Sequence, residues 1–471
     1  MQSVKCVLAI AAAVIAVSPG CRVDQAKEVA LYRQVVQLNP ATTRPTTQPA
    51  SPLTLREALL LANQQNERFS IEGENYLQAI INRKRAVALF LPTANLAGTY
   101  ALGENVGANS GSSNHVADLS AIGNINIFNG FRDVAQMKVA DLTIEERRWV
   151  LLDVQESLLA DVIRAYYQVL RNEQLVVVLQ HTLQLQDARV RDMRGRQNAG
   201  MARPLDVAQS EAQASSTRVT LINARNGAAN ARTALAFLTN EPLGGVPLTD
   251  DDPLPTQVGG RDSLRQAAMA GRQDLQASIK ATQAARQNVE VAVGQYYPSL
   301  SLNLRGFLYR ESSPSDRVWE SLLVANMPLF SAGRIEADVR QAWSQFRQAA
   351  LFESLLRRQI IRDVDTAYEN VQDAEERLAE LDVQVTAARQ AVQQAEGSYN
   401  AGLATNLERL TAQDQLLSAS LQWTSELYNR RVNYADVLRS TGGLRQRIEQ
   451  GVQTANPATA PTTMPLVTLT K

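Results

Sequence analysis

The sequence predicts a mixed but mainly α-helical, elongated protein, in which very long coiled-coil helices adjoin a small set of β-strands in an internal two-fold repeat. Three observations lead to this prediction. Ala, Gln, Leu and Arg recur along the 471 residues while aromatic residues make up only 5%, a composition typical of long helices. Two long stretches contain no proline. Four sequence landmarks return in the same order in the second half of the chain.

The repeat is defined by short segments that occur twice. Residues 198–202 (NAGMA) return as 400–404 (NAGLA), and residues 128–132 (FNGFR) return at the same spacing as 330–334 (FSAGR). Two further pairs are 91–96 with 297–302, and 55–58 with 264–267. Each half is far longer than a solenoid unit, so the chain duplicates a whole structural module. We therefore expect a first repeat at 53–240, an inter-repeat loop at 241–261, a second repeat at 262–443 and a disordered tail at 444–471.

Before the first repeat, the N-terminus has the pattern of an export signal. Lys5 precedes a short apolar run at 6–17, which is too short to span a bilayer but suits a signal peptide. Small residues then lead to Cys21, so we expect a signal peptide at 1–20. Acylation of Cys21 and simple cleavage without a lipid both remain open, and a single lipid would anchor the chain without spanning the membrane. The Pro- and Thr-rich stretch that completes 21–52 reads as a linker.

Each module is predicted to run helix, strand, strand, very long helix, turn, helix. In the first module, helical character covers 53–90, and no proline interrupts 132–202, which allows roughly 65 residues of helix, about 100 Å long. The second long helix is expected at 334–400, and return helices at 204–240 and 406–440. Apolar residues follow three- and four-residue steps along both long helices, which predicts pairing as coiled coils. In the second helix they are Ile361, Val364, Tyr368, Val371, Leu378, Leu381, Val385, Ala388, Val392 and Ala395.

The expected strands alternate with a period of two. Signals at 91–103 and 117–128 are matched in the second module by 299–308, where Leu300, Leu302 and Leu304 alternate with polar residues. Such segments suit a transmembrane barrel, although a half-buried soluble strand has the same pattern. No other stretch approaches 18 apolar residues, so any membrane crossing must use strands in a closed barrel. Four strands are too few to close one, and the chain must therefore form oligomers.

Charge and the reactive residues exclude several classes of protein. The 47 basic residues balance the 47 acidic residues, which gives no electrostatic reason to bind nucleic acid. Cys6 and Cys21 are the only cysteines, and His115 and His181 the only histidines, so we expect no disulfide framework, metal site or cofactor. No nucleotide-binding, hydrolase or metalloprotease motif is present, and an enzyme is not expected.

The ordered motifs resemble the TolC-like outer membrane efflux protein family, and in particular its lipoprotein members. The resemblance covers about 53–443 and rests on segments that are modest singly but strong in their order. They are 272–275 (RQDL), 297–302 (YPSLSL), 330–334 (FSAGR), 198–200 (NAG), 399–402 (YNAG) and 442–443 (GG).

The resemblance implies a homotrimer whose twelve strands close a β-barrel in the outer membrane and whose helices form a tube through the periplasm. It implies a passive exit duct of a tripartite efflux or type I secretion system. The expected partners are a periplasmic adaptor (membrane fusion protein), an inner-membrane RND or ABC transporter, and outer-membrane lipid. Many members carry an N-terminal lipid, which favours lipid attachment at Cys21. The alternative is a periplasmic coiled-coil adaptor or scaffold without a membrane barrel.

The resemblance also assigns site residues. The periplasmic tip would be formed by two turns, Asn198, Ala199 and Gly200 and Asn400, Ala401 and Gly402. The pore constriction would involve Asp206, Glu408 and Tyr399. Ala404 and Thr411 stand where some members have an arginine and a further acidic residue, so a constriction would be held differently here. Asp206 and Glu408 could instead be acidic residues favoured by a helix N-terminus, and the glycines could serve only the turns.

Overall fold

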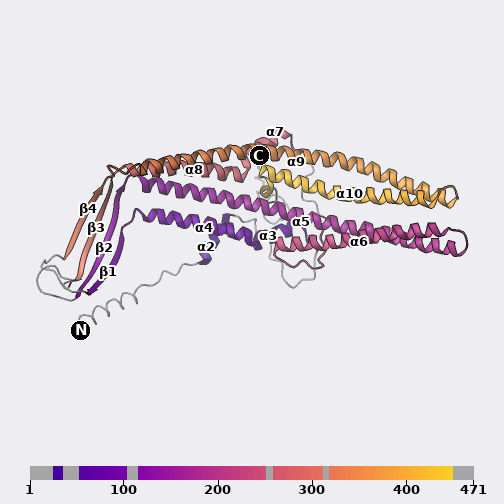
Figure 1. The fold of residues 1–471 in the computed structure, drawn as a ribbon, viewed down its shortest axis with the longest axis horizontal. Coiled ribbons are helices and arrows are strands. Elements are labelled where there is room, and N and C mark those ends of the chain that lie inside the picture. The colour runs from indigo at the N-terminus through magenta and orange to yellow at the C-terminus, as the bar shows by residue number, and fades with distance from the viewer. Residues whose placement is uncertain (1–24, 36–51, 103–114, 251–257, 311–317, 449–471) are drawn as a thin grey trace, which may run out of the picture.

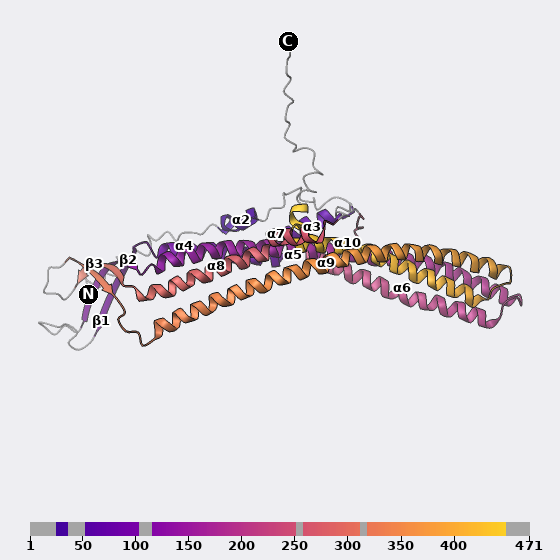
Figure 2. The same ribbon diagram turned by 90° about the horizontal axis from the view of Figure 1, so that it is seen from above.

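The chain is an elongated bundle of helices with a small β-sheet at one end and, at the other, two turns at which helices reverse direction. The computed structural model describes residues 25–35, 52–102, 115–250, 258–310 and 318–448. Figures 1 and 2 show the same arrangement from two directions, with the helices running lengthwise between the sheet and the turns. No helix in these described ranges is both long and apolar enough to cross a membrane.

The series helix, strand, strand, long helix and return helix occurs twice along the chain. The first half contains α2 (Gln25–Val35), α3 (Leu55–Gln65), α4 (Glu67–Ala88), β1 (Thr93–Leu102), β2 (His115–Asn129), α5 (Arg132–Asn198) and α6 (Pro204–Thr239). The second half contains α7 (Arg261–Gly271), α8 (Gln273–Val293), a short 3₁₀ turn (Gly294–Tyr296), β3 (Ser299–Arg310), β4 (Trp319–Asn326), α9 (Arg334–Asn400) and α10 (Asn406–Thr441).

The four strands form one antiparallel sheet in the order β1-β2-β3-β4. Directly opposed residues lie on the same face of a sheet, so the register assigns its two faces. Leu302 lies opposite both Ile125 and Leu323, which gathers apolar side chains on one face. On the other face, Asn124 and Asn303 are opposed and joined by a side-chain hydrogen bond of 2.6 Å. The sheet therefore has an apolar face and a more polar face.

Helices α5 and α9 dominate the length of the molecule. Each has 67 residues, about 100 Å at 1.5 Å per residue. Each reverses through a short turn into a helix of 36 residues, α6 or α10, with which it packs as a hairpin. Most of the stability of a protein helix in water comes from packing against other elements. The hairpin contacts therefore stabilise both long helices.

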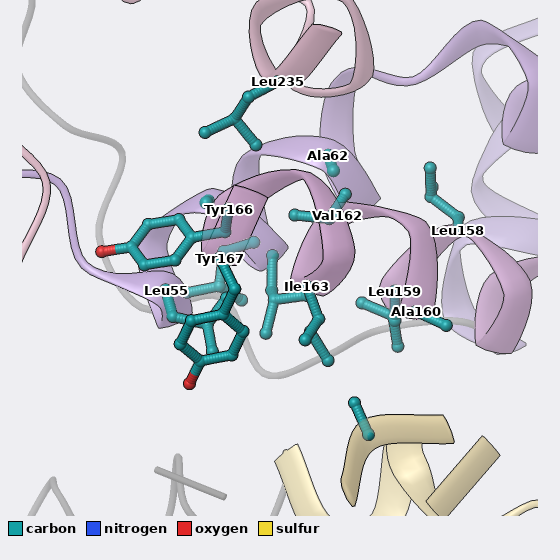
Figure 3. Packing of buried hydrophobic residues seen from close by; sticks show 14 of the residues in the cluster. Leu55, Ala62, Leu158, Leu159, Ala160, Val162, Ile163, Tyr166, Tyr167 and Leu235 are labelled. Atoms are coloured by element: carbon teal, nitrogen blue, oxygen red, sulfur yellow. The ribbon is translucent and has the colours of Figure 1, made fainter. Parts of the chain in front are cut away.

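The largest hydrophobic core surrounds the middle of α5. Leu159, Ile163, Tyr166 and Tyr167 are fully buried there among side chains from α3, α6 and α10 (Figure 3). The Tyr166 hydroxyl lies 2.7 Å from the carbonyl oxygens of both Leu53 and Thr249 and can donate its proton to one at a time. Leu53 and Leu248 form a parallel β-bridge beside it. This core fixes the chain segments before and after the first hairpin.

The structure differs from the sequence expectations at three places. The single helix expected over 53–90 is broken at Asn66, whose side-chain oxygen accepts hydrogen bonds from the backbone nitrogens of Arg68 and Phe69 and so caps α4. Ile361, expected on the coiled-coil face, is 37% exposed. Leu444 lies inside the range expected as a disordered tail, yet it is fully buried in the core. The domain boundaries otherwise stay predictions, and the helix starts expected at 132, 204, 334 and 406 agree with the structure.

Candidate functional site

The two expected tip turns lie together at the end of the molecule opposite the sheet (Figure 1). The first follows Asn198 and Ala199 and places Gly200 at a φ of 71°; the second follows Asn400 and Ala401 and places Gly402 at a φ of 73°. Glycine adopts this left-handed conformation without a Cβ penalty, so each helix can reverse within a few residues. The three residues of each turn are exposed.

The first turn leads into a carboxylate that is held by a neighbouring arginine. The Arg203 guanidinium donates to both carboxylate oxygens of Asp206, at 3.1 and 3.0 Å, and the Arg203 backbone nitrogen donates at 3.3 Å. These hydrogen bonds keep the pKa of Asp206 below its ordinary value. Only 8% of Asp206 is exposed, so its charge is largely balanced within the chain.

The second turn leads into a buried cation. Arg409 is 1% exposed, donates to Asn406 Oδ1 at 2.6 Å, and places its guanidinium 4.3 Å from the centre of the Tyr399 ring. Burial lowers the pKa of Arg409. The cation-π contact and the charge-assisted hydrogen bond offset part of the cost of burying this charge.

Asn406 connects the two hairpins. Its amide nitrogen donates to the backbone oxygen of Asp206 at 3.1 Å, while its amide oxygen accepts from Arg409. The structure thus brings Asp206 and Tyr399, both expected at a constriction, into one cluster with Arg203, Asn406 and Arg409. Further along the hairpins, Arg189 of α5 pairs with Glu396 of α9, and Gln213 of α6 bonds to Asp414 of α10.

Glu408, the third expected constriction residue, is arranged differently. It is exposed, and its carboxylate accepts from the backbone nitrogen of Thr405 at 3.0 Å while the Thr405 hydroxyl accepts from the Glu408 nitrogen. This reciprocal pair caps the start of α10. Helix capping therefore accounts for Glu408 locally, and its exposed charge remains available to the solvent at the tip.

Sequence reasoning missed three of the residues that form this cluster. Arg409, Asn406 and Arg203 read as ordinary helix-start residues, because nothing in a single sequence tells a buried arginine from a solvated one. The signal that could have found Arg203 is its position three residues before Asp206, next to the turn. Cys21, the expected lipid attachment residue, lies outside the described residues.

A groove separates the two hairpins above the tip. It has a volume of about 1100 Å³ and is bordered by all four helices, with Leu179 of α5, Asn223 of α6, Leu381 of α9 and Leu421 of α10 among its lining residues. The ion pair of Arg377 with Glu426, at 3.2 Å, lies at its edge. The hairpins therefore leave a partly apolar depression between them, roughly 30 Å along the helices from the turns at 1.5 Å per residue.

Comparison with known proteins agrees with this architecture. The outer membrane efflux protein family matches residues 78–241 and 264–443. Outer membrane efflux protein BepC of Brucella suis is 24% identical over 323 residues, covering 67% of this chain and 70% of BepC. Outer membrane protein TolC of Escherichia coli is 22% identical over 335 residues, covering 65% of this chain and 66% of TolC.

Solved structures share the fold. The outer-membrane channel OprN superposes with a TM-score of 0.74 at 20% identity, covering 87% of this chain and all of OprN. The outer membrane protein VceC of Vibrio cholerae superposes with a TM-score of 0.73 at 18% identity, covering 83% of this chain and 96% of VceC. Because these sequence identities are low, the structural likeness establishes the fold and nothing more specific.

The chain shares with OprN and VceC a fold class of long helical hairpins in line with a small antiparallel sheet. This chain belongs to the outer membrane efflux protein family, whose match covers most of its length. The membership confirms the TolC-like resemblance and supports an outer-membrane efflux channel over a periplasmic adaptor or scaffold. The family is one of passive channels rather than of enzymes.

Proposed function

We propose that this chain is the exit duct of a tripartite export system, which passively conducts substrates from an inner-membrane pump across the periplasm and outer membrane. The observation that carries the proposal is the position of a sheet with one apolar face at the end of helices 67 residues long. The sheet would lie in the membrane, and helices of about 100 Å would extend the duct into the periplasm.

The duct requires three copies of the chain. Strands β1 and β4 are the two edges of the described sheet, and unpaired edges favour pairing with another chain. Three four-stranded sheets would close a twelve-stranded barrel, within the range known for membrane barrels. Helix α9 supports this assembly because it leaves Trp343, Leu351 and Phe352 exposed, as expected of a surface that a neighbouring chain covers.

Duplication of one module accounts for the two halves of each chain. The pairs α5 with α9 and α6 with α10 have equal lengths, and the two long helices start at equivalent positions of the sequence repeat, Arg132 and Arg334. Six hairpins in the trimer would then bring six turns to one end. The exposed turns and the groove between the hairpins would meet a periplasmic adaptor (membrane fusion protein), and through it an inner-membrane RND or ABC transporter. Acylation of Cys21 would add a lipid anchor.

Imaging of the detergent-purified protein by electron microscopy tests the duct directly. We expect three-fold symmetric tubes with a detergent belt around one end, because the apolar face of the sheet needs an apolar environment. Thin solitary rods without a belt would contradict the duct and favour the adaptor alternative.

Single-channel recording tests the assignment of Asp206 and Glu408 to the constriction. Rings of carboxylates favour cations, so Glu408→Gln should lower the permeability ratio of cations to anions. Asp206→Asn removes the partner of Arg203 and should shift selectivity in the same direction. Asp262→Asn, whose side chain is 87% exposed near the middle of the molecule, is the matched control. Selectivity unchanged in both tip variants would remove these residues from the pore.

A further inference from the structure

The segments that join the sheet to α5 and α8 meet through two glycines, Gly130 before α5 and Gly294 after α8. A Cβ atom on Gly130 would lie 2.3 Å from the Gly294 carbonyl oxygen, and a Cβ atom on Gly294 would lie 2.6 Å from the Gly130 carbonyl oxygen. Only glycine fits at either position, so the two backbones are in contact where β2 passes into α5. This contact closes the upper end of a groove that opens between the two helices.

The residue after Gly130 holds a strained conformation. Phe131 has a φ of 62°, in the left-handed region that costs a bulky residue about 1–2 kcal/mol. At the corresponding junction of the second repeat, that position is Gly333, with a φ of 79°. The second junction instead holds Ala332, the counterpart of Gly130, at a φ of 51°, so each junction has one left-handed residue that is not glycine. In the first junction that residue is an aromatic side chain that is 65% exposed. The first junction therefore differs from the second in placing a large, exposed aromatic side chain at its left-handed position.

An aromatic group connects the sheet to the groove. The register of β2 shifts between Asn126 and Phe128, so that Phe128 lies opposite Leu300 on the apolar face. The Phe131 ring packs edge-on against Phe128, at 5.0 Å between centroids, and against Tyr297, at 6.2 Å. Phe131 and Tyr297 both line the groove. The apolar face of the sheet therefore continues through these rings into the groove.

The groove itself combines apolar walls with positive charge. Its volume is about 650 Å³, and Val134 and Leu142 of α5 and Val293 of α8 contribute apolar surface. Lys138 and Arg286 line it from opposite helices, together with one acidic residue, Glu290. Across the described residues, neither Lys138 nor Arg286 has a carboxylate within ion-pair distance. The net charge of the lining favours an anion.

We propose that this α5–α8 groove binds the phosphate headgroup of a glycerophospholipid from the membrane around the sheet. The proposal rests on the duct function, which places the sheet in a bilayer. Lys138 and Arg286 would hold the phosphate, while one acyl chain would lie along Phe131, Tyr297 and Phe128 toward the apolar face. Aromatic residues and long cationic side chains at the edge of the apolar band suit the chemistry of such a headgroup.

Native mass spectrometry of the detergent-purified protein with added dioleoyl-phosphatidylglycerol tests the groove. Wild type should retain the lipid under collisional activation, whereas the double variant Lys138→Gln with Arg286→Gln should bind it roughly ten- to thirty-fold more weakly. The control double variant, Arg191→Gln with Arg225→Gln, removes the same charge from α5 and α6, outside the α5–α8 groove, and should bind like wild type. Uncharged dioleoylglycerol should be retained poorly by all of them.

Phe131→Gly separates the role of the ring from effects on folding. This variant relieves the left-handed strain, so its unfolding temperature should be equal to or above that of wild type while lipid retention falls. Equal lipid retention in wild type, the groove double variant and Phe131→Gly would overturn the proposal. Trimers that lose no lipid in these variants would keep the duct and reject the groove. Monomers whose lipid retention still depends on Lys138 and Arg286 would keep the lipid groove and reject the duct.

Discussion

Helices α5 and α9 are equal in length, yet their middle turns are packed very differently. When the two helices are aligned from their first residues, Val162 and Val364 are both buried, as are Val169 and Val371. These positions form one buried face that both helices share. On the adjacent face, Leu159 is fully buried, whereas its counterpart Ile361 is 37% exposed. The two helices therefore share one buried face, whereas the adjacent face is buried in α5 and exposed in α9.

The difference lies in the short helix that covers each long one. In the first half, α3 buries five residues against α5, which are Leu55, Ala58, Leu59, Leu60 and Ala62. In the second half, α7 fully buries only Ala268, in a small apolar cluster with Ile360 and Val364 of α9. It adds the ion pair of Arg265 with Asp365 at 2.7 Å. Asp365 is the counterpart, in this alignment, of the buried Ile163. The first half is built around an apolar core inside the chain, and the second keeps a polar face. Surface ion pairs stabilise less than apolar burial, so the halves should respond unequally to matched substitutions.

The largest difference is expected for truncation of the paired aliphatic residues. Leu159→Ala leaves a cavity in the core and should lower the free energy of unfolding by about 2–5 kcal/mol. Ile361→Ala removes a partly solvated side chain and should cost under about 1 kcal/mol. Denaturant unfolding of both variants measures this difference. Equal losses would show that the two faces are packed alike and would break the comparison.

An intermediate effect is expected at Glu156, whose counterpart is the exposed Arg358. Burial raises the pKa of Glu156 from its ordinary value of 4.5 to about 7, because its carboxylate is 2% exposed in the middle of the molecule. Between those pH values the folded chain keeps a proton that the unfolded chain releases. The stabilising contribution is complete below pH 4.5 and is lost as the pH rises through 7, by roughly 3 kcal/mol.

Thermal unfolding between pH 5 and pH 8 measures this contribution. Glu156→Gln should flatten the decline in unfolding temperature that wild type has toward pH 8, while Arg358→Gln should leave it unchanged. A decline of the same steepness in wild type and Glu156→Gln would assign the pH dependence to other groups.

The smallest effect is expected for the paired tyrosines Tyr166 and Tyr368. Tyr166→Phe leaves the buried carbonyl oxygens of Leu53 and Thr249 without the hydroxyl and should cost about 1 kcal/mol. Tyr368 is half-buried with its ring 5.1 Å from the Arg261 guanidinium, a contact that Tyr368→Phe retains. The second variant should therefore stay within a few tenths of a kcal/mol of wild type in the same unfolding measurement.

The elements with strong periodic signals were predictable from the sequence. The absence of proline and the positions of Gly200 and Gly402 set the lengths of the long helices, and alternation identified β1, β2 and β3. The break at Asn66 was not predictable, since an asparagine inside an amphipathic stretch can also face solvent. The shift in β2 that turns Phe128 to the apolar face depends on pairing with β3, which strand alternation alone does not encode.

At the candidate site, the turns and the position of Asp206 followed from sequence, but its environment did not. Its pairing with Arg203 is local, three residues earlier, but its contact with Asn406 depends on the packing of one hairpin against the other. The burial of Arg409 and Glu156 has the same origin, because residues from helices far apart in sequence enclose them. Tertiary contacts of this kind leave no local pattern of spacing or composition.

The unbroken course of α5 and α9 also has a mechanical consequence. Proline is absent from both helices, and the one glycine in each, Gly195 or Gly397, lies in the last turn. Sharp bends in helices need such residues, so each long helix should behave as a stiff shaft. Its compliance is confined to the turns and to the junctions below the strands. A tilt at one end of a long helix must then produce a tilt at the other end. Such a tilt would act on the contacts between the hairpins at Asn406, Glu396 and Asp414.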